Sequence, residues 1–477
     1  MISRTAPFVV CRWFSRLKFC ALVLLAGLTL PFGRAAPPAR APNIVILLAD
    51  DLGRGDLGYA GSDIRTPNLD RFVSTGVRLD RFYACPVCSP TRAGLLTGRW
   101  PIRYGIMRTV IPPWSSYGLP REERTLADAL AGAGYTRRGL FGKWHLGHAR
   151  RAYLPPQRGF THFYGHYNGA LDYFTHRREG EVDWHRGNES VKEDGYTTDL
   201  IAREAVTFIE QAPTASPFFA YIAFNAPHSP FQAKPEDLAR YPGRQGNRRA
   251  YAAMVDAMDQ AIGRVLEAIA KRPDADNTFV LFFSDNGGHA PVASNAPMRD
   301  GKFSVYEGGI RVAAAVRWPA GGLTGGRVCA EPIGYIDVFP TALRLAGVKP
   351  PASAPSLDGR DVLDVMRGDA RAPDRAWFSY IAPQEKQDAA VHAGEWKLVL
   401  SGGEVLSGRP DPATKAELYH IVNDPQEKTD LAARHPEHVE RLRKLLGEFG
   451  RLQKAGVAAY GAGRGNFKAP KDWVIAD

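Results

Sequence analysis

The sequence is poor in cysteine. Only five cysteines occur among 477 residues, which excludes a small domain held together by disulfide bonds. Beyond residue 36 only Cys85, Cys88 and Cys329 remain, and whether Cys85 pairs with Cys329 is left open by the sequence. Hydrophobic residues make up 44% of the chain and charged residues 23%. A folded globular protein is therefore expected, and disorder over most of the chain is excluded.

A long apolar run is also lacking at the N-terminus. The apolar stretch 19–32 is shorter than a membrane-spanning helix requires. Basic residues precede it, and the small residues Gly33, Ala35 and Ala36 follow it, in the order of a secretory signal. We therefore predict a signal peptide over residues 1–36 and no stable membrane anchor, with an uncleaved anchor as the alternative. The protein is expected to be exported: periplasmic or secreted, or lysosomal in a eukaryote.

Acidic residues are too few to balance the basic ones. The chain has 61 Lys and Arg against 50 Asp and Glu, a formal net charge of +11. An excess of this sign fits an anionic substrate, a polyanion or an acidic surface. No nucleic-acid-binding motif accompanies the charge, so nucleic acid is not expected as a partner of an exported protein.

Apolar runs typical of buried strands alternate with helical patterns over most of the chain. The runs 43–49, 218–224 and 278–283 are typical of strands that are covered on both faces. Residues 66–74 have the start and stop signals of a helix, with Pro67 at its beginning and Gly76 after its end, and residues 254–269 have the pattern of an amphipathic helix. This alternation predicts an α/β fold with a large, mostly parallel sheet flanked by helices.

The pattern changes after about residue 369. Residues 377–381, 389–400 and 417–421 have the pattern of short successive strands, and a polar helix is expected over 436–452. A small antiparallel sheet with one helix is therefore predicted for the C-terminal part. The predicted organisation is a signal peptide (1–36), a main α/β domain (37–370) and a C-terminal subdomain (371–477).

Carboxylates follow two of the predicted strands. Asp50 and Asp51 end the first run, and Asp285 and Asn286 lie just beyond a later one. Ligands of open α/β sheets bind beyond the carboxyl ends of the strands, so two parallel strands would bring these side chains to one edge. Hard oxygen ligands suit Ca²⁺ or Mg²⁺ rather than zinc. Asp and Asn are also common in helix caps and turns, but two such groups at strand ends favour a metal site.

The segment around Cys88 carries a more specific pattern. Ser89 is a suitable N-cap and Pro90 suits the first helical position, so a helix is predicted to begin just after Cys88. The backbone N–H groups at such a helix start favour negative charge. Arg92 lies one turn into the helix, where its guanidinium can point toward the group that Cys88 carries. A plain structural cysteine is the alternative.

These residues resemble the signature of a known family. Cys-x-Pro-x-Arg from Cys88, followed by Leu-Thr-Gly-Arg at 96–99, is similar to the signature of the formylglycine-dependent sulfatases of the alkaline phosphatase superfamily. Thr91 stands where that family most often has serine. The resemblance covers nearly all of the chain beyond the signal peptide and implies an alkaline-phosphatase-like fold. The other matching motifs are Asp50-Asp51, Gly-Lys-Trp-His-Leu-Gly at 142–147, Ala-Pro-His-Ser-Pro at 226–230, Ser-Asp-Asn-Gly at 284–287, Gly-Lys at 301–302 and Glu-Trp-Lys-Leu at 395–398.

The resemblance implies a modified cysteine and a metal ion. In that family the cysteine is oxidised after synthesis to formylglycine (3-oxoalanine), and the hydrate of this aldehyde is the nucleophile. Cys88 is therefore expected to be converted by a formylglycine-generating enzyme, a partner during maturation. A calcium ion, with magnesium as the alternative, is expected on Asp50, Asp51, Asp285, Asn286 and an oxygen of modified Cys88.

The resemblance also implies roles for the charged residues. The cations would bind and polarise the sulfuryl oxygens, and Asp285 with the metal would activate the nucleophile. His228, with Lys302, would assist the leaving alcohol as general acid, and His145 would accept a proton when sulfate is expelled. The expected catalytic set is Cys88, Arg92, Lys143, His145, His228 and Lys302.

Segments outside the catalytic motifs carry a narrower resemblance. Residues 154–160, 298–302 and 391–397 are similar to the N-acetylgalactosamine-4-sulfatases of the family. This implies hydrolysis of a sulfate ester on a sulfated sugar of the 4-sulfated galactosamine or galactose type. Tyr173 and Trp184 are candidates for stacking on sugar rings, with a place in the core as the alternative. A loop-rich basic region that would attract a polyanion contains Arg150, Arg151, Arg177, Arg178 and the histidines His148, His162, His166, His176 and His185.

Three other functions stay open. The first two are an arylsulfatase of broad specificity and a phosphate or phosphonate monoester hydrolase, since the same cationic clamp accepts a phosphoryl group. The third is a non-catalytic binder of sulfated glycans in which Cys88 remains a thiol. The complete set of expected catalytic residues argues against loss of catalysis.

Overall fold

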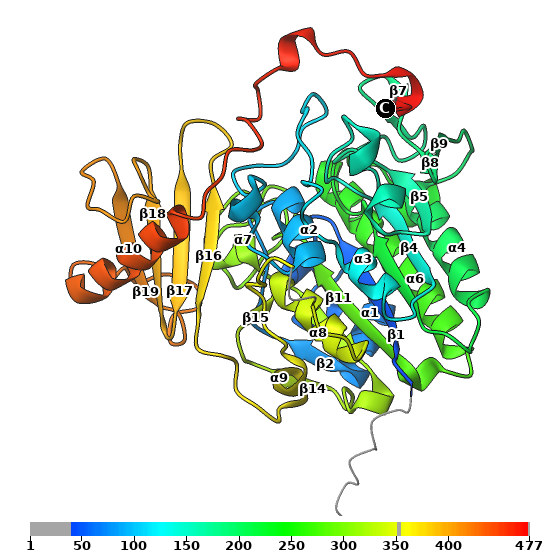
Figure 1. The fold of residues 1–477 in the computed structure, drawn as a ribbon, viewed down its shortest axis with the longest axis horizontal. Helices are drawn as coiled ribbons and strands as arrows, with labels where there is room; N and C mark the ends of the chain where they lie inside the picture. The colour runs from blue at the N-terminus through cyan, green and yellow to red at the C-terminus, as the bar shows by residue number, and fades with distance from the viewer. Residues whose placement is uncertain (1–39, 351–353, 476–477) are drawn as a thin grey trace, which may run out of the picture. The chain divides into compact units, whose positions relative to one another are not determined.

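A ten-stranded sheet dominates the computed structural model, which describes residues 40–350 and 354–475 (Figure 1). The predicted signal peptide lies outside the described residues. Parallel pairing joins the five central strands from β11 to β5, so the predicted mixed, mostly parallel sheet is confirmed. In spatial order the strands are β14 (Arg327–Cys329), β2 (Val77–Leu79), β13 (Ala314–Arg317), β11 (Thr278–Ser284), β1 (Asn43–Ala49), β10 (Phe218–Ala223), β4 (Arg137–Lys143), β5 (His162–His166), β8 (His185–Arg186) and β9 (Glu189–Ser190).

Helices cover both faces of this sheet. Side chains of β1 alternate between the two faces of the sheet: Val45 and Leu47 pack in the core on one face, and Ile46 and Leu48 pack in the core on the other. Because both faces are covered, the strand is apolar from Ile44 to Ala49. Helices α1 (Pro67–Thr75), α4 (Thr197–Glu210) and α6 (Gly246–Ala270) contribute to the first core. The second core is formed with α2 (Cys88–Thr97), α3 (Leu126–Ala131) and α8 (Val338–Leu345).

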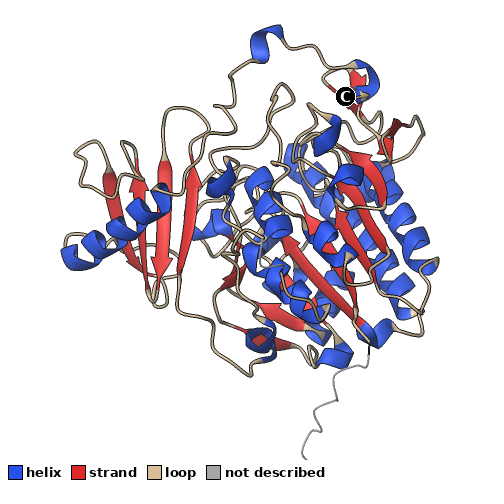
Figure 2. Cartoon of the chain, in the orientation of Figure 1, coloured by secondary structure: helices blue, strands red, loops and turns tan. Residues whose placement is uncertain are grey.

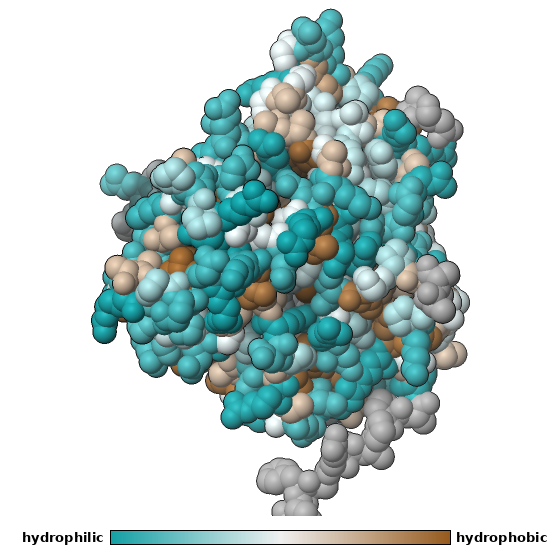
Figure 3. All heavy atoms as spheres, turned by 60° about the vertical axis from the view of Figure 1, so that its left-hand side comes forward, coloured by the Kyte–Doolittle hydropathy of each residue, from teal (hydrophilic) through white to brown (hydrophobic). Residues whose placement is uncertain are grey.

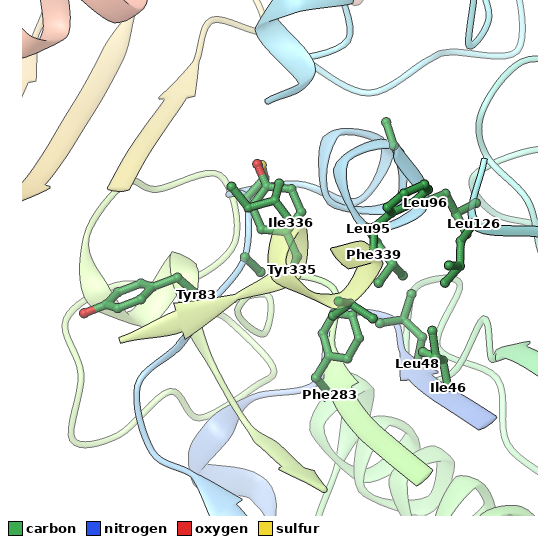
Figure 4. Close-up of a cluster of buried hydrophobic side chains, with 14 of the residues drawn as sticks. Ile46, Leu48, Tyr83, Leu95, Leu96, Leu126, Phe283, Tyr335, Ile336 and Phe339 are labelled. Atoms are coloured by element: carbon green, nitrogen blue, oxygen red, sulfur yellow. The ribbon is translucent and has the colours of Figure 1, made fainter. Parts of the chain in front are cut away.

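Figure 4 shows part of the second core. Leucines of α2 and α3 and Phe339 of α8 lie over the side chains of β1 and β11. This packing anchors α2, and with it Cys88, to the sheet. The labelled side chains that make this contact are Leu95, Leu96, Leu126, Phe339, Ile46, Leu48 and Phe283.

Several shorter elements lie around the main sheet. A three-stranded sheet contains β3 (Phe82–Tyr83), β12 (Arg311–Val312) and β15 (Ile333–Gly334). Strands β6 (Arg177–Arg178) and β7 (Glu181–Val182) form a hairpin. The short helices are α5 (Pro235–Leu238), α7 (Glu307–Ile310) and α9 (Leu363–Arg367).

The C-terminal part is the predicted antiparallel sheet with one helix (Figure 2). Its strands are β16 (Ala376–Ile381), β17 (Asp388–Ala393), β18 (Trp396–Ser401) and β19 (Lys415–His420), and α10 (Pro436–Gly450) packs against β17 and β18. The single strand expected over 389–400 is wrong. Two strands occupy this stretch, joined by a turn at Gly394, whose φ of 64° suits glycine. The domain boundary at residue 370 stays a prediction.

The segment after α10 was not anticipated from the sequence. Residues 451–475, here called the C-terminal strap, run back from α10 to the hairpin β6–β7 (Figure 1). The backbone N–H of Val457 donates to the carbonyl of Gly105 at 2.9 Å. At the far end, Trp473 Nε1 donates to the carbonyl of Arg178 at 3.0 Å. The strap therefore connects the C-terminal sheet to the segment at Gly105 and to the hairpin β6–β7.

The surface that Figure 3 shows and the cysteines of the described residues bear on two of the predictions. The face in Figure 3 is mostly hydrophilic, with hydrophobic side chains in small separate areas. None of the helices in the described ranges is long and apolar enough to cross a membrane. Cys85 and Cys329 are both free and buried; Cys85 Sγ donates to Tyr335 Oη at 3.1 Å, so the pairing left open above does not occur.

Candidate active site

Parallel pairing of β1 and β11 brings the predicted oxygen ligands to one edge of the sheet. The last registered pair is Ala49 with Ser284, so Asp50 and Asp285 follow at the same level. The N–H of Asp285 donates to the Ala49 carbonyl at 3.0 Å. Both carboxylates are fully buried. The predicted juxtaposition of the two strand ends is confirmed.

This edge has the donors that a hard cation requires. Asp50 Oδ1 and Asn286 Oδ1 are buried and accept no hydrogen bond from any described residue. Ligand atoms of Asp50, Cys88 and Asp285 lie within 4.8 Å of one another. Buried oxygens without partners are costly unless a cation or water satisfies them. The residues present therefore fit an ion of the Ca²⁺ or Mg²⁺ type.

Three buried cations lie against the same carboxylates. The ion pairs are Arg92 with Asp285 (Nη2–Oδ2 2.8 Å), Lys302 with Asp51 (Nζ–Oδ2 2.8 Å) and Lys143 with Asp50. Each cation is thus held in place by a charge-assisted hydrogen bond. Arg92 also donates from Nη1 to the carbonyl of Lys143 at 3.0 Å, which links α2 to the end of β4.

Burial and these neighbours set the ionisation of the site. Burial, reinforced by the charge of Asp50, raises the pKa of Asp285 to about 6. Burial would also raise the pKa of Asp51, but Lys302 and His228 hold it well below its usual range. Burial, followed by the charge of Lys302, lowers the pKa of His228 to about 3. The site therefore mixes groups of both signs in a low-dielectric environment.

Cys88 and His145 are in direct contact. Cys88 Sγ lies 3.2 Å from His145 Nδ1, and His145 Nε2 lies 3.0 Å from the carbonyl of Ile111. A carbonyl only accepts, so Nε2 carries the proton and the lone pair of Nδ1 faces Cys88. Burial, with the charge of Lys143, lowers the pKa of His145 well below its usual range. His145 is thus placed to accept a proton from a group at position 88.

The predicted cap of α2 is wrong. The helix begins at Cys88 itself, after Val87, and Ser89 makes no capping hydrogen bond. Instead Ser89 Oγ donates to the His145 carbonyl at 3.0 Å and accepts from the N–H of Ile111 at 3.1 Å. The hydroxyl therefore bonds to two segments outside its own helix and links the backbone of His145 to that of Ile111.

Two residues of the site have backbone conformations that are rare outside glycine. Asp51 has a φ of 67° and His145 a φ of 57°, and such strain is characteristic of functional sites. Gly169 leaves the room that His145 needs, because a Cβ there would lie 2.4 Å from the imidazole Cε1. Gly169 was missed, and a lone glycine in a loop offers no sequence signal for this role.

Asp183 is a second residue that the sequence analysis missed. It is fully buried and accepts from the backbone N–H groups of Tyr167 and Asn168, both at 2.9 Å. The carbonyl of Tyr167 in turn accepts from the N–H of His145 at 3.0 Å. Asp183 therefore supports the segment that positions His145. Its signal was an acidic residue between the apolar neighbours Val182 and Trp184.

Many side chains of the histidine-rich basic region, which we expected to surround the active site, are buried in the protein core. Trp184 and Tyr173 are fully buried, so neither is available to a sugar. Tyr173 Oη donates to the carbonyl of His228 at 2.8 Å and so supports that residue. Most of the histidines pack against aromatic rings in the interior, whereas His162 is exposed. The buried ones are His148, His166, His176 and His185.

The reactive side chains open onto a cavity of about 540 Å³. Cys88, Asp51, His145, His228 and Lys302 line its inner part. Loops and strand ends of the main sheet, together with the C-terminal part, supply the remaining walls. A cavity of this size accommodates a small organic ligand.

Comparison with known proteins identifies the family. A family model described as Sulfatase matches residues 42–348. The chain belongs to the sulfatase family. This sulfatase is 33% identical to the human N-acetylgalactosamine-6-sulfatase over 469 residues, which cover 89% of this chain and 88% of that protein. It is 30% identical to mouse arylsulfatase J over 455 residues, covering 86% and 75% of the two chains.

Solved structures agree with this assignment. The crystal structure of Ps i-CgsB matches the sulfatase with a TM-score of 0.81 and 31% identity, covering 89% of this chain and 96% of that one. The same protein has been solved in complex with k-i-k-neocarrahexaose. The predicted alkaline-phosphatase-like fold is confirmed, and the sulfatase is a sulfuric ester hydrolase.

Proposed function

We propose that this sulfatase hydrolyses the sulfate ester of a sulfated sugar, with modified Cys88 as the nucleophile. The observation that carries the proposal is the contact of Cys88 with the unprotonated Nδ1 of His145, beside cations that are buried against carboxylates. Conversion of Cys88 to formylglycine by a separate maturing enzyme, in an exported protein, is part of the proposal. The expected catalytic residues are Cys88, Arg92, Lys143, His145, His228 and Lys302.

The proposed cofactor is a calcium ion, with magnesium as the alternative. Asp50, Asp51, Asp285, Asn286 and an oxygen of modified Cys88 would hold it. When bound, such an ion stabilises negative charge and favours the ionised form of a coordinated hydroxyl. The unpartnered oxygens of Asp50 and Asn286 support the proposal, and hard oxygen donors favour these ions over zinc.

Different residues would act on the sulfuryl group and on the leaving alcohol of the sulfate ester. Arg92 and Lys143 fix positive charge deep in the site, where an anionic sulfuryl group gains most from it. His145 accepts a proton from the group on residue 88. His228 Nδ1 lies 2.6 Å from the carbonyl of Ser229 and so carries a proton. Its Nε2, which lies 3.6 Å from Asp51 Oδ2, is therefore the nitrogen that would take up a second proton when His228 acts as general acid toward the leaving alcohol.

Lys302 lies beside His228 and supports this role. Both contact the same oxygen of Asp51, Lys302 at 2.8 Å and His228 at 3.6 Å. A fixed ammonium at this distance strengthens the field at the leaving oxygen. The overall reaction consumes one water and releases the sugar hydroxyl and inorganic sulfate.

A sulfated galactosamine or galactose is the proposed substrate class, with the sulfate at O4. The names of two matched proteins, an N-acetylgalactosamine-6-sulfatase and a complex with a neocarrahexaose, support a sulfated sugar of this type. The O4 position rests on the similarity of residues 154–160 and 391–397 to N-acetylgalactosamine-4-sulfatases. Arg150 and Arg177 are exposed and would attract a polyanion.

A substrate panel tests this proposal. Purified enzyme is assayed for sulfate release from 4-sulfated and 6-sulfated N-acetylgalactosamine oligosaccharides and from an aryl sulfate, and for phosphate release from an aryl phosphate. We expect the 4-sulfated sugar to have a kcat/KM at least about tenfold above that of the 6-sulfated one. Faster 6-sulfate hydrolysis would move the site of action to O6, and faster phosphate release would favour the phosphatase alternative. Activity on the oligosaccharide should also fall more steeply with salt than activity on the aryl sulfate.

A further inference from the structure

One wall of the active-site cavity carries residues that the hydrolysis does not use. Arg178 of β6 and Tyr460 of the C-terminal strap line the same cavity as Cys88 and Lys302. Resting on the function proposed above, we propose that Arg178 and Tyr460 form a subsite for the sugar next to the one that carries the scissile sulfate. Arg178 binds an anionic group on that neighbouring sugar, a sulfate or a carboxylate.

Arg178 has the hydrogen-bonding capacity that this role needs. It is partly buried, and its one ion pair to a described residue is with Glu179, at 3.3 Å from Nε to Oε1. This contact lacks the geometry of a hydrogen bond, so the buried Nε makes no hydrogen bond to any part of the described chain. By contrast, Arg92 and Lys302 are paired with the buried carboxylates of Asp285 and Asp51, both at 2.8 Å. A guanidinium with free N–H groups is matched in shape to sulfate and carboxylate oxygens.

The charge of the cavity wall also favours an anion at this place. Asp51 is the one carboxylate among the described residues that line the cavity, and Lys302 already neutralises it. An anionic group near Arg178 therefore meets no unpaired negative charge on the wall. Its attraction is stronger there than on the open surface because the cavity limits screening by solvent.

The strap fixes Arg178 in place. Trp473 is 1% exposed, and its Nε1 donates to the carbonyl of Arg178 at 3.0 Å. One residue earlier, the backbone N–H of Asp472 donates to Glu181 Oε2 of the same hairpin at 2.9 Å. The hairpin β6–β7 is thus tied at two points, so Arg178 is positioned before substrate arrives, which lowers the entropic cost of binding.

Tyr460 supplies an aromatic ring on the same wall. Its backbone N–H donates to the carbonyl of Pro383 at 3.0 Å, and its carbonyl accepts from Trp114 Nε1 at 2.9 Å. The ring is half-buried and packs edge-on against Trp114 at 5.3 Å. A ring held in this way presents an apolar face and a polar hydroxyl, a combination that suits a sugar.

The test compares three disaccharides that carry the same scissile sulfate, at whichever position the wild type hydrolyses fastest. The neighbouring sugar is neutral in the first, carries a carboxylate in the second and carries a sulfate in the third. The measured quantity is the ratio of kcat/KM for each charged neighbour to that for the neutral one. Arg186→Ala is the matched control, because Arg186 is exposed and pairs with Glu204 away from the cavity lining.

We expect wild type and Arg186→Ala to prefer at least one charged neighbour by about tenfold or more, a preference that Arg178→Ala reduces to within about twofold. Arg178→Lys keeps the positive charge but loses the paired N–H groups of the guanidinium, so this variant should retain part of the preference for a charged neighbour. Tyr460→Ala should raise KM for all three disaccharides while an aryl sulfate is less affected. Comparison of the second and third disaccharides shows whether Arg178 recognises a carboxylate or a sulfate.

Two outcomes would overturn the subsite: a wild type without any preference for a charged neighbour, or an Arg178→Ala variant that keeps the wild-type preference. A variant that loses activity equally on all three disaccharides and the aryl sulfate would show a structural role for Arg178 instead. Failure of the wild type on every sulfate ester, the aryl sulfate included, would instead contradict the function proposed above.

Discussion

Arg92 and Asp285 form a fully buried ion pair in which two guanidinium nitrogens donate to one carboxylate oxygen. The distances from Nε and Nη2 of Arg92 to Oδ2 of Asp285 are 3.0 and 2.8 Å. The other oxygen, Oδ1, is 3.4 Å from the N–H of Asp51, a weak contact. Asp285 therefore neutralises Arg92 with one oxygen and leaves the other available to the proposed cation and nucleophile.

Replacement of Asp285 by asparagine should therefore impair turnover more than substrate binding. We expect Asp285→Asn to lower kcat by about 10²- to 10³-fold, a loss typical for one preorganised polar group in an active site, with a smaller change in KM. Initial rates of sulfate release over a range of substrate concentrations measure both. Mass spectrometry of the Cys88 peptide controls for maturation, and a mature variant with nearly wild-type kcat would contradict the role of Asp285.

Removal of the metal should abolish activity and lower stability. A chelator would leave Asp50 Oδ1 and Asn286 Oδ1 buried without a partner and three carboxylates close together. At a free ion concentration about 100 times its Kd, binding stabilises a protein by about 3 kcal/mol, so a lower Tm is expected in the chelator. Calcium or magnesium should restore both properties. Active protein that contains stoichiometric zinc and neither of these ions would contradict the proposed site.

Lys397 should be essential for stability. Its Nζ lies 2.9 Å from Glu307 Oε1 and 2.8 Å from Glu427 Oε1, and all three side chains are buried. Lys397→Met leaves two buried carboxylates facing each other and should destabilise the protein by about 3–5 kcal/mol. Lys415→Met is the control, because this lysine is exposed and its pair is worth at most about 1 kcal/mol. Urea unfolding measures both, and equal effects would refute the prediction.

Asp183 should make stability sensitive to acid. Burial opposes its ionisation, but the hydrogen bond and charge of His185 and the N–H of Tyr167 hold its pKa well below the usual range. Its contribution is therefore present above the unfolded-state pKa of about 3.9 and is lost as the pH falls below it. Asp183→Asn should cost about 2–4 kcal/mol near pH 6.

The difference between Asp183→Asn and wild type should narrow as the pH approaches about 3.5, since the wild-type carboxylate is then losing its advantage. Urea unfolding at several pH values from about 6 to about 3.5 gives this difference directly. A difference that stays constant over this range would show that the ionisation of Asp183 contributes nothing to folding.

Local patterns predicted the parts of the fold that neighbouring residues determine. The run 43–49 became β1 without a shift, because each of its apolar side chains, from Ile44 to Ala49, is buried in one of two cores. The strand-end residues Asp50 and Asp285 could be placed together because parallel strands share an edge. The turn at Gly394 was missed because apolar alternation continues on both sides of it.

The predictions that were wrong, and the features that were missed, concern contacts between segments that are distant in the sequence. Ser89 looks like a cap in its own helix, but Ile111 and His145 use its hydroxyl instead. Trp184 was a candidate for stacking on a sugar ring, but it packs inside the protein beside His166 and His176. The C-terminal strap has no periodic pattern at all, since isolated contacts such as that of Trp473 with Arg178 hold it.

Cys88→Ala should be inactive and folded. The side chain of Cys88 contacts His145 at 3.2 Å, and loss of one sulfur from a polar site should cost little stability compared with core deletions. Thermal unfolding and sulfate release, measured on the same preparation, separate the two effects. An active Cys88→Ala enzyme would rule out residue 88 as the nucleophile.

Mass spectrometry of the peptide that spans Cys88, taken from active wild-type enzyme, tests the proposed chemistry most directly. We predict that Cys88 is present as formylglycine, in a fraction that rises with specific activity across preparations made with different amounts of the maturing enzyme. Fully active protein in which residue 88 is an unmodified cysteine would contradict it.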